Sequence, residues 1–430
     1  MIVFKYENAL IPKSKISSIA KKLVPELKKL NSAGYDDDRA SINLPTDDKM
    51  LRVVNAAVEL KKKLHPQLIV VVGIGGSNLG TVAVQEAILG KQWNLQHSPK
   101  ILYADTVDPD ALQAVIEEMQ QVLRQGQQIV LNVISKSGST TETIANFEIL
   151  LNVLKRHRKD AQKYVVVTTD KNSKLWNLGI KSGFSLLEIP RKVGGRYSVF
   201  SPVGLFPLGM LGINLKELLS GAAEMRKQCI SLNVKNNPAA IGASLIYLHN
   251  KTGRNIYDHF IFATDLESMG KWYRQLLAES VGKEQNLKGK RVNAGITPTV
   301  SIGSTDLHSM AQLYLGGPSD KLTNFVITHF NTTLKVPYYP EYNALVPDLQ
   351  KKELNHIMHA MLYGTMAAYK KGKRPYTETR LDGKNAKAVG AFIQLKMIET
   401  ILLAKLLDVN PFDQPAVESY KKETRRILVR

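Results

Sequence analysis

The chain has 430 residues, of which 44% are hydrophobic and 22% are charged, as is usual for a globular protein. This length predicts two domains, because single hydrophobic cores rarely grow so large. One cysteine, Cys229, excludes an internal disulfide and a cysteine-based metal cluster, and favours a reducing compartment. The sequence lacks a membrane-length apolar run and a signal-peptide pattern, so a cytoplasmic protein is expected.

The formal net charge of +20 comes from 58 basic and 38 acidic residues. Such a balance is compatible with nucleic acid, an anionic surface or an acidic small substrate as the partner. The basic clusters, at 61–63, 155–159 and 370–374, are scattered rather than gathered in one tail. Because no zinc-finger, RNA-recognition or basic-zipper pattern occurs, specific nucleic-acid binding is not expected. A basic surface would instead speed the encounter with a phosphorylated metabolite.

The first sixty residues predict peripheral helices, at 16–30 and 47–64. Apolar runs then alternate with helical stretches, which is the pattern of βαβ units. The predicted strands are 68–72, 101–104, 129–134, 164–168 and 186–189, followed in a second succession by 255–263, 299–302 and 324–328. A long helix is expected at 385–407. The fold class is therefore α/β, with two doubly wound αβα-sandwich domains of mainly parallel sheet and peripheral helices at both termini.

These elements predict a division of the chain into five parts. They are an N-terminal helical segment (1–60), a first α/β domain (61–205), a helical linker (206–237), a second α/β domain (238–384) and C-terminal helices that complete the active site (385–430). Ligands of open parallel sheets bind outside the carboxyl ends of strands. The loops that follow the strands are therefore the places where functional residues are expected.

The loop at 73–80, Gly-Ile-Gly-Gly-Ser-Asn-Leu-Gly, follows the first predicted strand of the first domain. Gly76 allows close approach of backbone amides to a ligand, and Ser77 adds a hydroxyl. The spacing departs from GxGxxG and no Walker lysine follows, so neither a dinucleotide loop nor a P-loop is predicted. A tight turn between strand and helix is the alternative, and the serine-rich loop two strands later favours a phosphosugar site.

That second loop, Ser-Lys-Ser-Gly-Ser-Thr-Thr at 135–141, joins a strand end to a helix start. The N–H groups at a helix start are unpaired and the helix dipole is positive there, so an anion is stabilised. Hydroxyl or ammonium donors come from Ser135, Lys136, Ser137 and Thr140. We predict a phosphate site, with simple N-capping by a threonine as the alternative.

Two further motifs carry candidates for proton transfer and charge stabilisation. Arg196 follows Gly194 and Gly195, whose lack of side chains leaves its guanidinium room to face developing negative charge. Glu279 ends an apolar helix, and Gln275 lies one turn earlier on the same face, so Glu279 is the candidate base. A surface salt bridge for the arginine and a solvated carboxylate for the glutamate are the alternatives.

The last candidates are His308, Gln414 and Lys421. His308 follows a strand end and is suited to proton transfer near neutral pH, unless it is a structural histidine. Gln414 and Lys421 are seven residues apart, hence on one side of a helix if a single helix includes both.

Taken in order, six segments resemble the glucose-6-phosphate isomerase family of the compact bacterial type. They are GIGGSNLG, SKSGSTTET, GGRYS, AESVGK, STDLHS and FDQPAVESYK. Ala416 departs from the glycine usual in that family. The resemblance implies reversible isomerisation of glucose 6-phosphate to fructose 6-phosphate, in glycolysis and gluconeogenesis, through ring opening and a cis-enediolate. It also implies that the reaction uses no metal and no cofactor.

The resemblance further implies a role for each candidate. The sugar phosphate is held by Ser135, Ser137 and Thr140, with Lys136, Ser77 and Gly76 beside them. Glu279 moves a proton between C2 and C1, and Arg196 stabilises the enediolate. His308 and Lys421 open the sugar ring, while Gln275 and Gln414 bind sugar hydroxyls. The family forms homodimers in which the histidine comes from the neighbouring subunit, so His308 is expected to act across an interface.

Two other functions remain open at this stage. One is a phosphosugar isomerase of wider scope, which also takes mannose 6-phosphate or an amino sugar. The other is a non-catalytic phosphosugar sensor, which would be expected to lack the proton-transfer groups and to carry a DNA-binding module.

Overall fold

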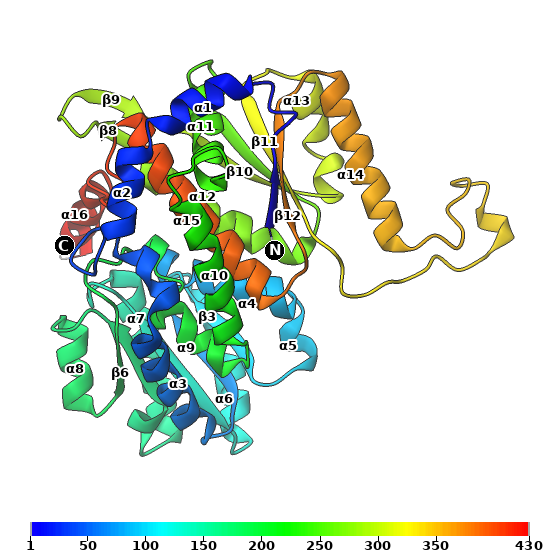
Figure 1. Cartoon of the computed structure of the whole chain (residues 1–430). Helices are drawn as coiled ribbons and strands as arrows, with labels where there is room; N and C mark the ends of the chain where they lie inside the picture. Colours follow the sequence, from blue (N-terminus) through cyan, green and yellow to red (C-terminus); the bar gives the residue numbers. More distant parts are fainter. Residues whose placement is uncertain (1, 429–430) are drawn as a thin grey trace. The chain divides into compact units, whose positions relative to one another are not determined.

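The computed structural model describes residues 2–428 of the chain. The chain forms two compact units: unit 1 comprises Met1–Glu26 and Ser231–Arg430, and unit 2 comprises Leu27–Ile230. Each unit is built on its own sheet with helices packed against it (Figure 1). The finer division at residues 60, 205, 237 and 384 stays a prediction.

Unit 2 contains a five-stranded parallel sheet in the order β3-β2-β4-β5-β6. The five strands expected in the first succession are confirmed, each within two residues of its predicted bounds. They are β2 (Pro66–Val72), β3 (Lys100–Ala104), β4 (Gln128–Ile134), β5 (Val165–Thr169) and β6 (Ser185–Glu188). The helices are α3 (Asp48–Lys62), α4 (Leu79–Leu89), α5 (Trp93–Gln96), α6 (Pro109–Arg124), α7 (Thr141–His157), α8 (Lys174–Ser182), α9 (Pro202–Met210) and α10 (Leu215–Cys229).

The apolar runs of β2 and β4 are continuous because both faces of these strands are buried. Val70 and Leu131 belong to the cluster formed with α6, α7 and α8 on one face. Their neighbours Val71 and Val130 are also fully buried and point to the other face, where α9 contacts β2. A doubly wound sheet requires burial of this kind.

The strand order of unit 2 has a topological switch point between β2 and β4. From β2 the chain crosses to β3 on one side, and from β3 it crosses back to β4 on the other side. The loops that leave the carboxyl ends of β2 and β4 therefore diverge, which opens a place for a ligand between them. These are the two loops in which Ser77 and Ser135 were predicted to bind phosphate.

Unit 1 contains a second five-stranded sheet, in the order β1-β12-β11-β7-β10. Four strands are parallel, in the same relative order as in unit 2, and β1 is antiparallel to β12. The three strands predicted in the second succession are confirmed as β7 (Ile256–Ile261), β10 (Thr297–Ile302) and β11 (Lys321–Ile327). The others are β1 (Ile2–Lys5), β12 (Tyr376–Leu381) and a hairpin of β8 (Lys283–Gln285) and β9 (Arg291–Ala294).

Helices cover both faces of the unit 1 sheet. One face packs against α13 (Ala311–Gly316) and α14 (Leu354–Lys371), whose Tyr314 and Leu362 share a cluster with Phe260 and Phe325 of the sheet. The other side carries three helices, α11 (Pro238–Asn250), α12 (Glu267–Val281) and α15 (Ala386–Leu407), and α15 contacts both of the others. The remaining helices are α1 (Lys13–Lys21), α16 (Val417–Leu428) and α2 (Val24–Ser32), which contains the boundary between the units.

The N-terminal segment differs from its helical prediction in two places. Residues 2–5 form β1, because their backbone pairs with β12, a distant partner that local periodicity does not reveal. The helix expected at 16–30 is interrupted between α1 and α2. Pro25 explains the break, since its ring would clash with the carbonyl of Lys21 in a continuous helix and it has no N–H to donate.

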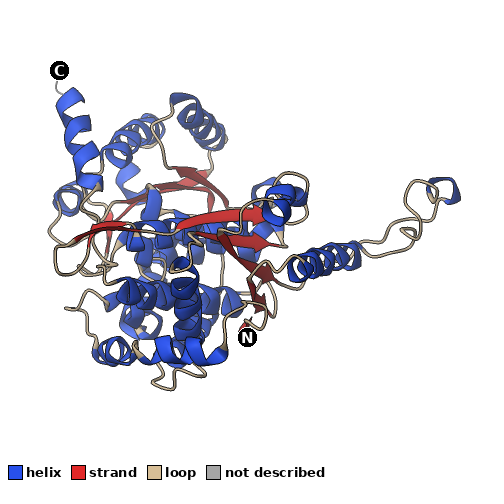
Figure 2. Ribbon diagram, turned by 90° about the horizontal axis from the view of Figure 1, so that it is seen from above, coloured by secondary structure: helices blue, strands red, loops and turns tan. Residues whose placement is uncertain are grey.

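An arm of the chain, residues 328–353, joins β11 to α14 and contains little regular structure. Figure 2 shows it extending away from the sheet of its own unit. Its large apolar side chains are mostly exposed: Leu334, Tyr338, Tyr339, Tyr342, Leu345 and Val346. Side chains of this kind, gathered on a protrusion, are typical of a surface that binds another protein.

Within residues 2–428, no helix has both the length and the apolar character needed to cross a membrane. In the same part of the chain, no three His, Cys, Asp or Glu side chains are grouped as ligands of one metal ion.

A buried ion pair lies among the helices that cover one face of the unit 1 sheet. Lys396 donates to Glu399 Oε1 at 2.9 Å, and both side chains are at most 1% exposed. Tyr273 of α12 donates to the same oxygen at 3.2 Å, so the pair links α12 to α15. A Cβ on Gly242 would lie 2.1 Å from Glu399 Oε2, so α11 must carry glycine there. Removing one partner would leave an uncompensated buried charge.

We therefore expect Lys396→Met to lower the free energy of unfolding by about 3–5 kcal/mol, measured by urea denaturation. The control is Lys271→Met, because Lys271 forms a half-exposed pair with Glu267 whose loss should cost less than about 1 kcal/mol. The double variant Lys396→Met/Glu399→Leu should recover most of the loss. Equal losses for the two single variants would contradict this account.

Candidate active site

The serine-rich loop is fixed at the carboxyl end of β4. Ser135 is buried, and its Oγ lies 2.9 Å from Thr140 Oγ1. The Ser135 carbonyl accepts a hydrogen bond from Thr169 Oγ1 at 2.5 Å, which ties the loop to the end of β5. Gly138 has φ +65°, and a Cβ there would meet Ser173 Oγ at 2.7 Å, so this turn requires glycine.

The N-terminus of α7 follows this loop directly, as predicted. Thr140 occupies the N-cap position, but its side chain makes no capping hydrogen bond and contacts Ser135 instead. The arrangement favours an anion site over the simple capping alternative, because the first N–H groups of α7 are left for a ligand. Burial lowers the pKa of the Lys136 ammonium; Asp170 opposes this shift and Lys192 adds to it.

The glycine loop after β2 lies against two other parts of unit 2. A Cβ on Gly73 would be 3.1 Å from the Ile134 carbonyl, so this turn touches the residue before Ser135. A Cβ on Gly76 would be 2.2 Å from the carbonyl carbon of Gly195 and 2.6 Å from the Arg196 nitrogen. The loops after β2, β4 and β6 are therefore neighbours, and each carries predicted site residues.

Arg196 lies in the short 3₁₀ helix Gly195–Tyr197, directly after the two glycines. Its residue surface is 2% exposed, and its guanidinium lies 5.4 Å from the Tyr197 ring centroid. Ser198 Oγ donates to the Gly195 and Gly76 carbonyls at 2.7 and 3.3 Å, which joins this turn to the glycine loop. A guanidinium held in so little water acts strongly on nearby negative charge.

In unit 1, Glu279 lies in the last turn of α12, near the helix end as predicted, and its carboxylate is bound by two amides. Gln275 Nε2 donates to Oε1 at 3.2 Å, and Gln414 Nε2 donates to Oε2 at 2.9 Å. Glu279 and Gln414 line a pocket of about 540 Å³ with residues 282–287, 410, 413 and 415–417. This volume is within the range of small-molecule sites. The structure thus brings Gln275, Glu279 and Gln414 together.

His308 lies apart from this group, although it belongs to the same unit. It is exposed, and it follows β10 and the short helix Thr305–Leu307 at the carboxyl edge of the sheet. The end of α12 lies at the opposite edge, since a Cβ on Gly295, just before β10, would be 3.8 Å from Gly282 Cα. Six strand residues between the two edges span roughly 20 Å. His308 and Glu279 of one chain therefore do not meet.

Lys421 lies on α16, which begins at Val417. The condition that one helix includes both Gln414 and Lys421 is not met, because residues 410–416 precede the helix. Asn410 accepts from the Phe412 N–H and donates to Asp413, each at 3.0 Å, and this local bonding delays the helix start. Lys421 Nζ donates to Glu418 Oε1 at 2.9 Å on the surface of α16.

The sequence interpretation gave no role to Lys283, although AESVGK contains it. Lys283 Nζ donates to the Glu279 carbonyl at 2.6 Å and to the Asp413 carbonyl at 2.9 Å. A signal was present in the sequence, since a lysine at the end of an apolar helix that carries the base is within reach of the last carbonyls.

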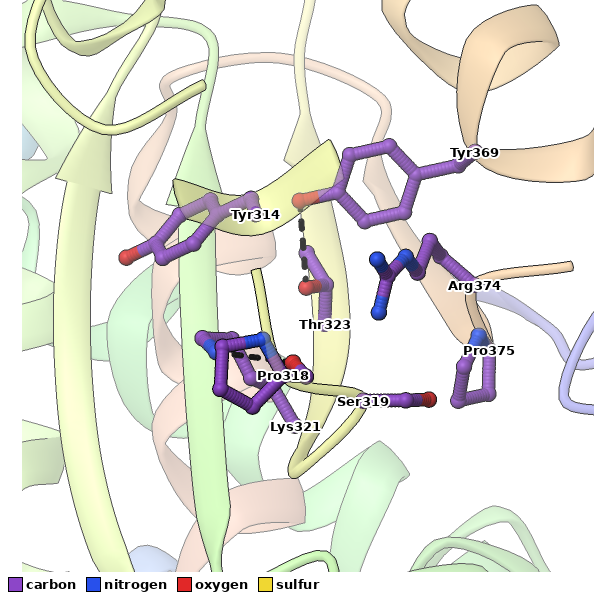
Figure 3. Close-up of a pocket in the computed structure, with 8 residues that line it drawn as sticks. All are labelled: Tyr314, Pro318, Ser319, Lys321, Thr323, Tyr369, Arg374 and Pro375. Carbon is purple, nitrogen blue, oxygen red and sulfur yellow. Dashed lines mark hydrogen bonds between the residues drawn. The ribbon is translucent and has the colours of Figure 1, made fainter. Parts of the chain in front are cut away.

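A second, much smaller pocket lies at the start of β11 (Figure 3). It is walled by Tyr314, Lys321, Thr323, Tyr369 and Arg374, among others. Its volume of about 10 Å³ is enough for one water molecule and far too small for a hexose phosphate. None of the predicted site residues lines it, so the pocket beside Glu279 is the candidate site in this unit.

The contact between the glycine loop and the Arg196 turn predicts that Gly76→Ala disrupts unit 2. The new Cβ would meet backbone atoms that have no room to move, so we expect a loss of about 1–3 kcal/mol in unfolding free energy and weaker binding of inorganic phosphate. Gly34→Ala is the control, because nothing lies within 4 Å of its Cβ position. Calorimetry and phosphate titration of both variants test this, and an unchanged Gly76→Ala protein would contradict it.

Comparison with known proteins identifies the family. A sequence model of phosphoglucose isomerase matches residues 61–430. The glucose-6-phosphate isomerase of Carboxydothermus hydrogenoformans is 35% identical over 393 residues, covering 89% of this chain and 83% of the relative. A hypothetical protein of Thermus thermophilus is similar in structure, with a TM-score of 0.88, 30% identity and 100% of both chains covered. A glucose-6-phosphate isomerase of Chlamydia trachomatis shares the fold, with a TM-score of 0.84, 18% identity, and 99% and 88% of the two chains covered. The chain belongs to the phosphoglucose isomerase family.

Proposed function

We infer that the protein interconverts glucose 6-phosphate and fructose 6-phosphate, as a cytoplasmic step of glycolysis and gluconeogenesis. Family membership over residues 61–430 gives the reaction class. The observation that carries the inference is the Glu279 carboxylate, which two glutamine amides hold beside a pocket of about 540 Å³. A base held in one orientation is what an aldose–ketose isomerase needs.

Isomerisation requires a base and a group that stabilises negative charge, and we assign these roles to Glu279 and Arg196. The C2 proton beside an aldehyde is weakly acidic, and its removal leaves negative charge shared by the oxygens on C1 and C2. Glu279 takes that proton and returns it to C1. Arg196 stabilises the charge of the enediolate, and its burial supports this role because a desolvated cation acts strongly.

The phosphate of the substrate provides binding energy away from the reacting carbons. We assign it to the loop after β4, with donors from Ser135, Lys136, Ser137 and Thr140, and to Gly76 and Ser77 of the neighbouring loop. The switch point between β2 and β4 and the free start of α7 support this assignment. Gln275 and Gln414 have amide groups left to bind sugar hydroxyls while they hold Glu279.

Ring opening requires a proton donor at the ring oxygen and an acceptor for the anomeric proton. We assign these steps to His308 and Lys421. Because His308 lies at the opposite edge of the sheet from Glu279 of its own chain, we propose that His308 serves the site of a second copy in a homodimer.

The arm at 328–353 supports this dimer. It follows β11 and so leaves the same carboxyl edge of the sheet that His308 follows from β10. Its exposed tyrosine and leucine side chains, among them Tyr338 and Leu345, need an apolar partner surface. A second copy satisfies both requirements, since a twofold contact brings the arm and His308 of each chain to its partner.

Glu279→Gln should abolish isomerisation, because an amide does not accept the C2 proton. We expect kcat to fall by a factor of about 10²–10⁴ and the affinity for glucose 6-phosphate to stay near that of the wild type. The assay follows fructose 6-phosphate and deuterium incorporation at C2 in heavy water. Glu267→Gln, at the partly exposed start of the same helix, is the control. Normal turnover by Glu279→Gln would place the base elsewhere.

Mixing two inactive variants tests the shared site. If His308 acts in the partner's site, a heterodimer of Glu279→Gln and His308→Ala has one site with both defects and one with neither. Subunit exchange should then restore about a quarter of the wild-type activity. If His308 acts within its own chain, every site keeps one defect and mixing restores nothing. Light scattering on the same samples measures the oligomeric state.

A further inference from the structure

Lys283 is a buried lysine that the reaction does not use directly. It opens β8, two residues after α12 ends, and its side chain is 6% exposed. Its ammonium donates to the carbonyls of Glu279 and Asp413, at 2.6 and 2.9 Å, and lies 3.5 Å from Asp413 Oδ1. Burial of an ammonium is costly unless several acceptors surround it. The presence of a lysine here therefore requires an explanation other than filling space.

The two carbonyls belong to the two segments that meet at the candidate base. One is the carbonyl of Glu279 itself, and the other precedes Gln414, whose Nε2 donates to Glu279 Oε2 at 2.9 Å. One ammonium thus joins the backbones from which the carboxylate and its amide partner extend. The length of the hydrogen bond from Gln414 Nε2 to Glu279 Oε2 depends on the distance between these two backbone segments.

Other contacts hold the rest of the same connection. Asn286 Nδ2 donates to Asp408 Oδ2 at 3.0 Å, and the Leu287 N–H donates to the Asp408 carbonyl at 2.8 Å. These bonds attach the β8–β9 hairpin to the chain just after α15. Lys283 binds the far end of the stretch from Asp408 to Gln414, at the Asp413 carbonyl.

We propose that Lys283 is a positioning residue, which aligns Gln414 on the carboxylate of Glu279. This inference rests on the proposed role of Glu279 as the base. A displacement of about 1 Å in a reacting group can lower the rate by about 10²-fold. The lysine therefore acts on the chemical step through Gln414 and Glu279, without touching the substrate.

The kinetic test compares Lys283→Met with Lys283→Arg. Methionine fills the space without donating, so we expect kcat to fall by about 10- to 100-fold with KM changed less than about threefold. Arginine can still donate to both carbonyls and should recover part of kcat. Lys271→Met, on the exposed face of α12, should leave both constants unchanged. A Lys283→Met enzyme with lower thermal stability but wild-type kcat per folded molecule would overturn the proposal.

A double-mutant cycle distinguishes alignment from general stability. If Lys283 acts through Gln414, the loss of kcat in Lys283→Met/Gln414→Ala should not exceed the larger of the two single losses. Additive losses would mean that Lys283 acts by another route and would overturn the proposal. If Lys283→Met fails to fold, Asn286→Ala serves instead. It removes the less buried hydrogen bond from Asn286 to Asp408, which also anchors the segment leading to Gln414, and it should lower kcat as well.

A crystal structure of Lys283→Met tests the alignment without reference to activity. We expect Gln414 Nε2 to lie more than 3.5 Å from Glu279 Oε2. An unchanged hydrogen bond would overturn the positioning role even in an active enzyme. Absence of isomerisation in the wild type would instead count against the proposed function, while the crystal structure would still decide the geometry.

Discussion

The direction of one crossover connection, from β7 through α12 to β10, determines at which edge of the unit 1 sheet each candidate residue lies. Parallel strands β7 and β10 require the chain to return from the carboxyl edge of the sheet to the amino edge, and α12 makes that return. The last turn of α12, with Glu279, therefore lies at the amino edge. His308 follows β10 and lies at the carboxyl edge. Side-chain rotamers alone cannot bring the two groups together within one chain, because a strand of six residues separates them. The proposal that both act on one substrate therefore implies a second copy of the chain.

The parallel strands of the two units follow the same order, but the candidate residues lie at different edges of the two sheets. In unit 2 the loops at the carboxyl ends carry the hydroxyls, the glycines and Arg196, in agreement with the rule for open parallel sheets. In unit 1 Glu279, the proposed base, and its two glutamines gather at the amino edge, where α12 ends and the segment after α15 passes. The fold determines where each loop leaves the sheet, and the side chains on that loop determine which ligands or reactions the edge can support.

The sequence predicted those features that depend on neighbouring residues. Strands such as β4 were found because both faces are buried and the apolar run is continuous, and the loops followed from the strand ends. Features set by distant partners were not found. The strand at Ile2–Lys5 exists through pairing with β12, and the Asp413 carbonyl that binds Lys283 is 130 residues away from it in the sequence. The start of α16 at Val417 depends on turns around Asn410, which helical spacing alone does not reveal.

Charge in this protein is abundant on the surface, yet two cations to which we assign roles, Arg196 and Lys283, are shielded from water. Exposed pairs such as that of Lys271 and Glu267 are weakened by water and salt, and they contribute little to binding or stability. Arg196 and Lys283 are nearly inaccessible to solvent: the Arg196 guanidinium lies beside the Tyr197 ring, and the Lys283 ammonium donates to two backbone carbonyls. A shielded cation has a stronger and better directed field, but it is expensive for folding. That cost is reasonable where the charge acts on a defined atom. In the proposed roles, this atom is an enediolate oxygen for Arg196, and for Lys283 it is each of the Glu279 and Asp413 carbonyl oxygens.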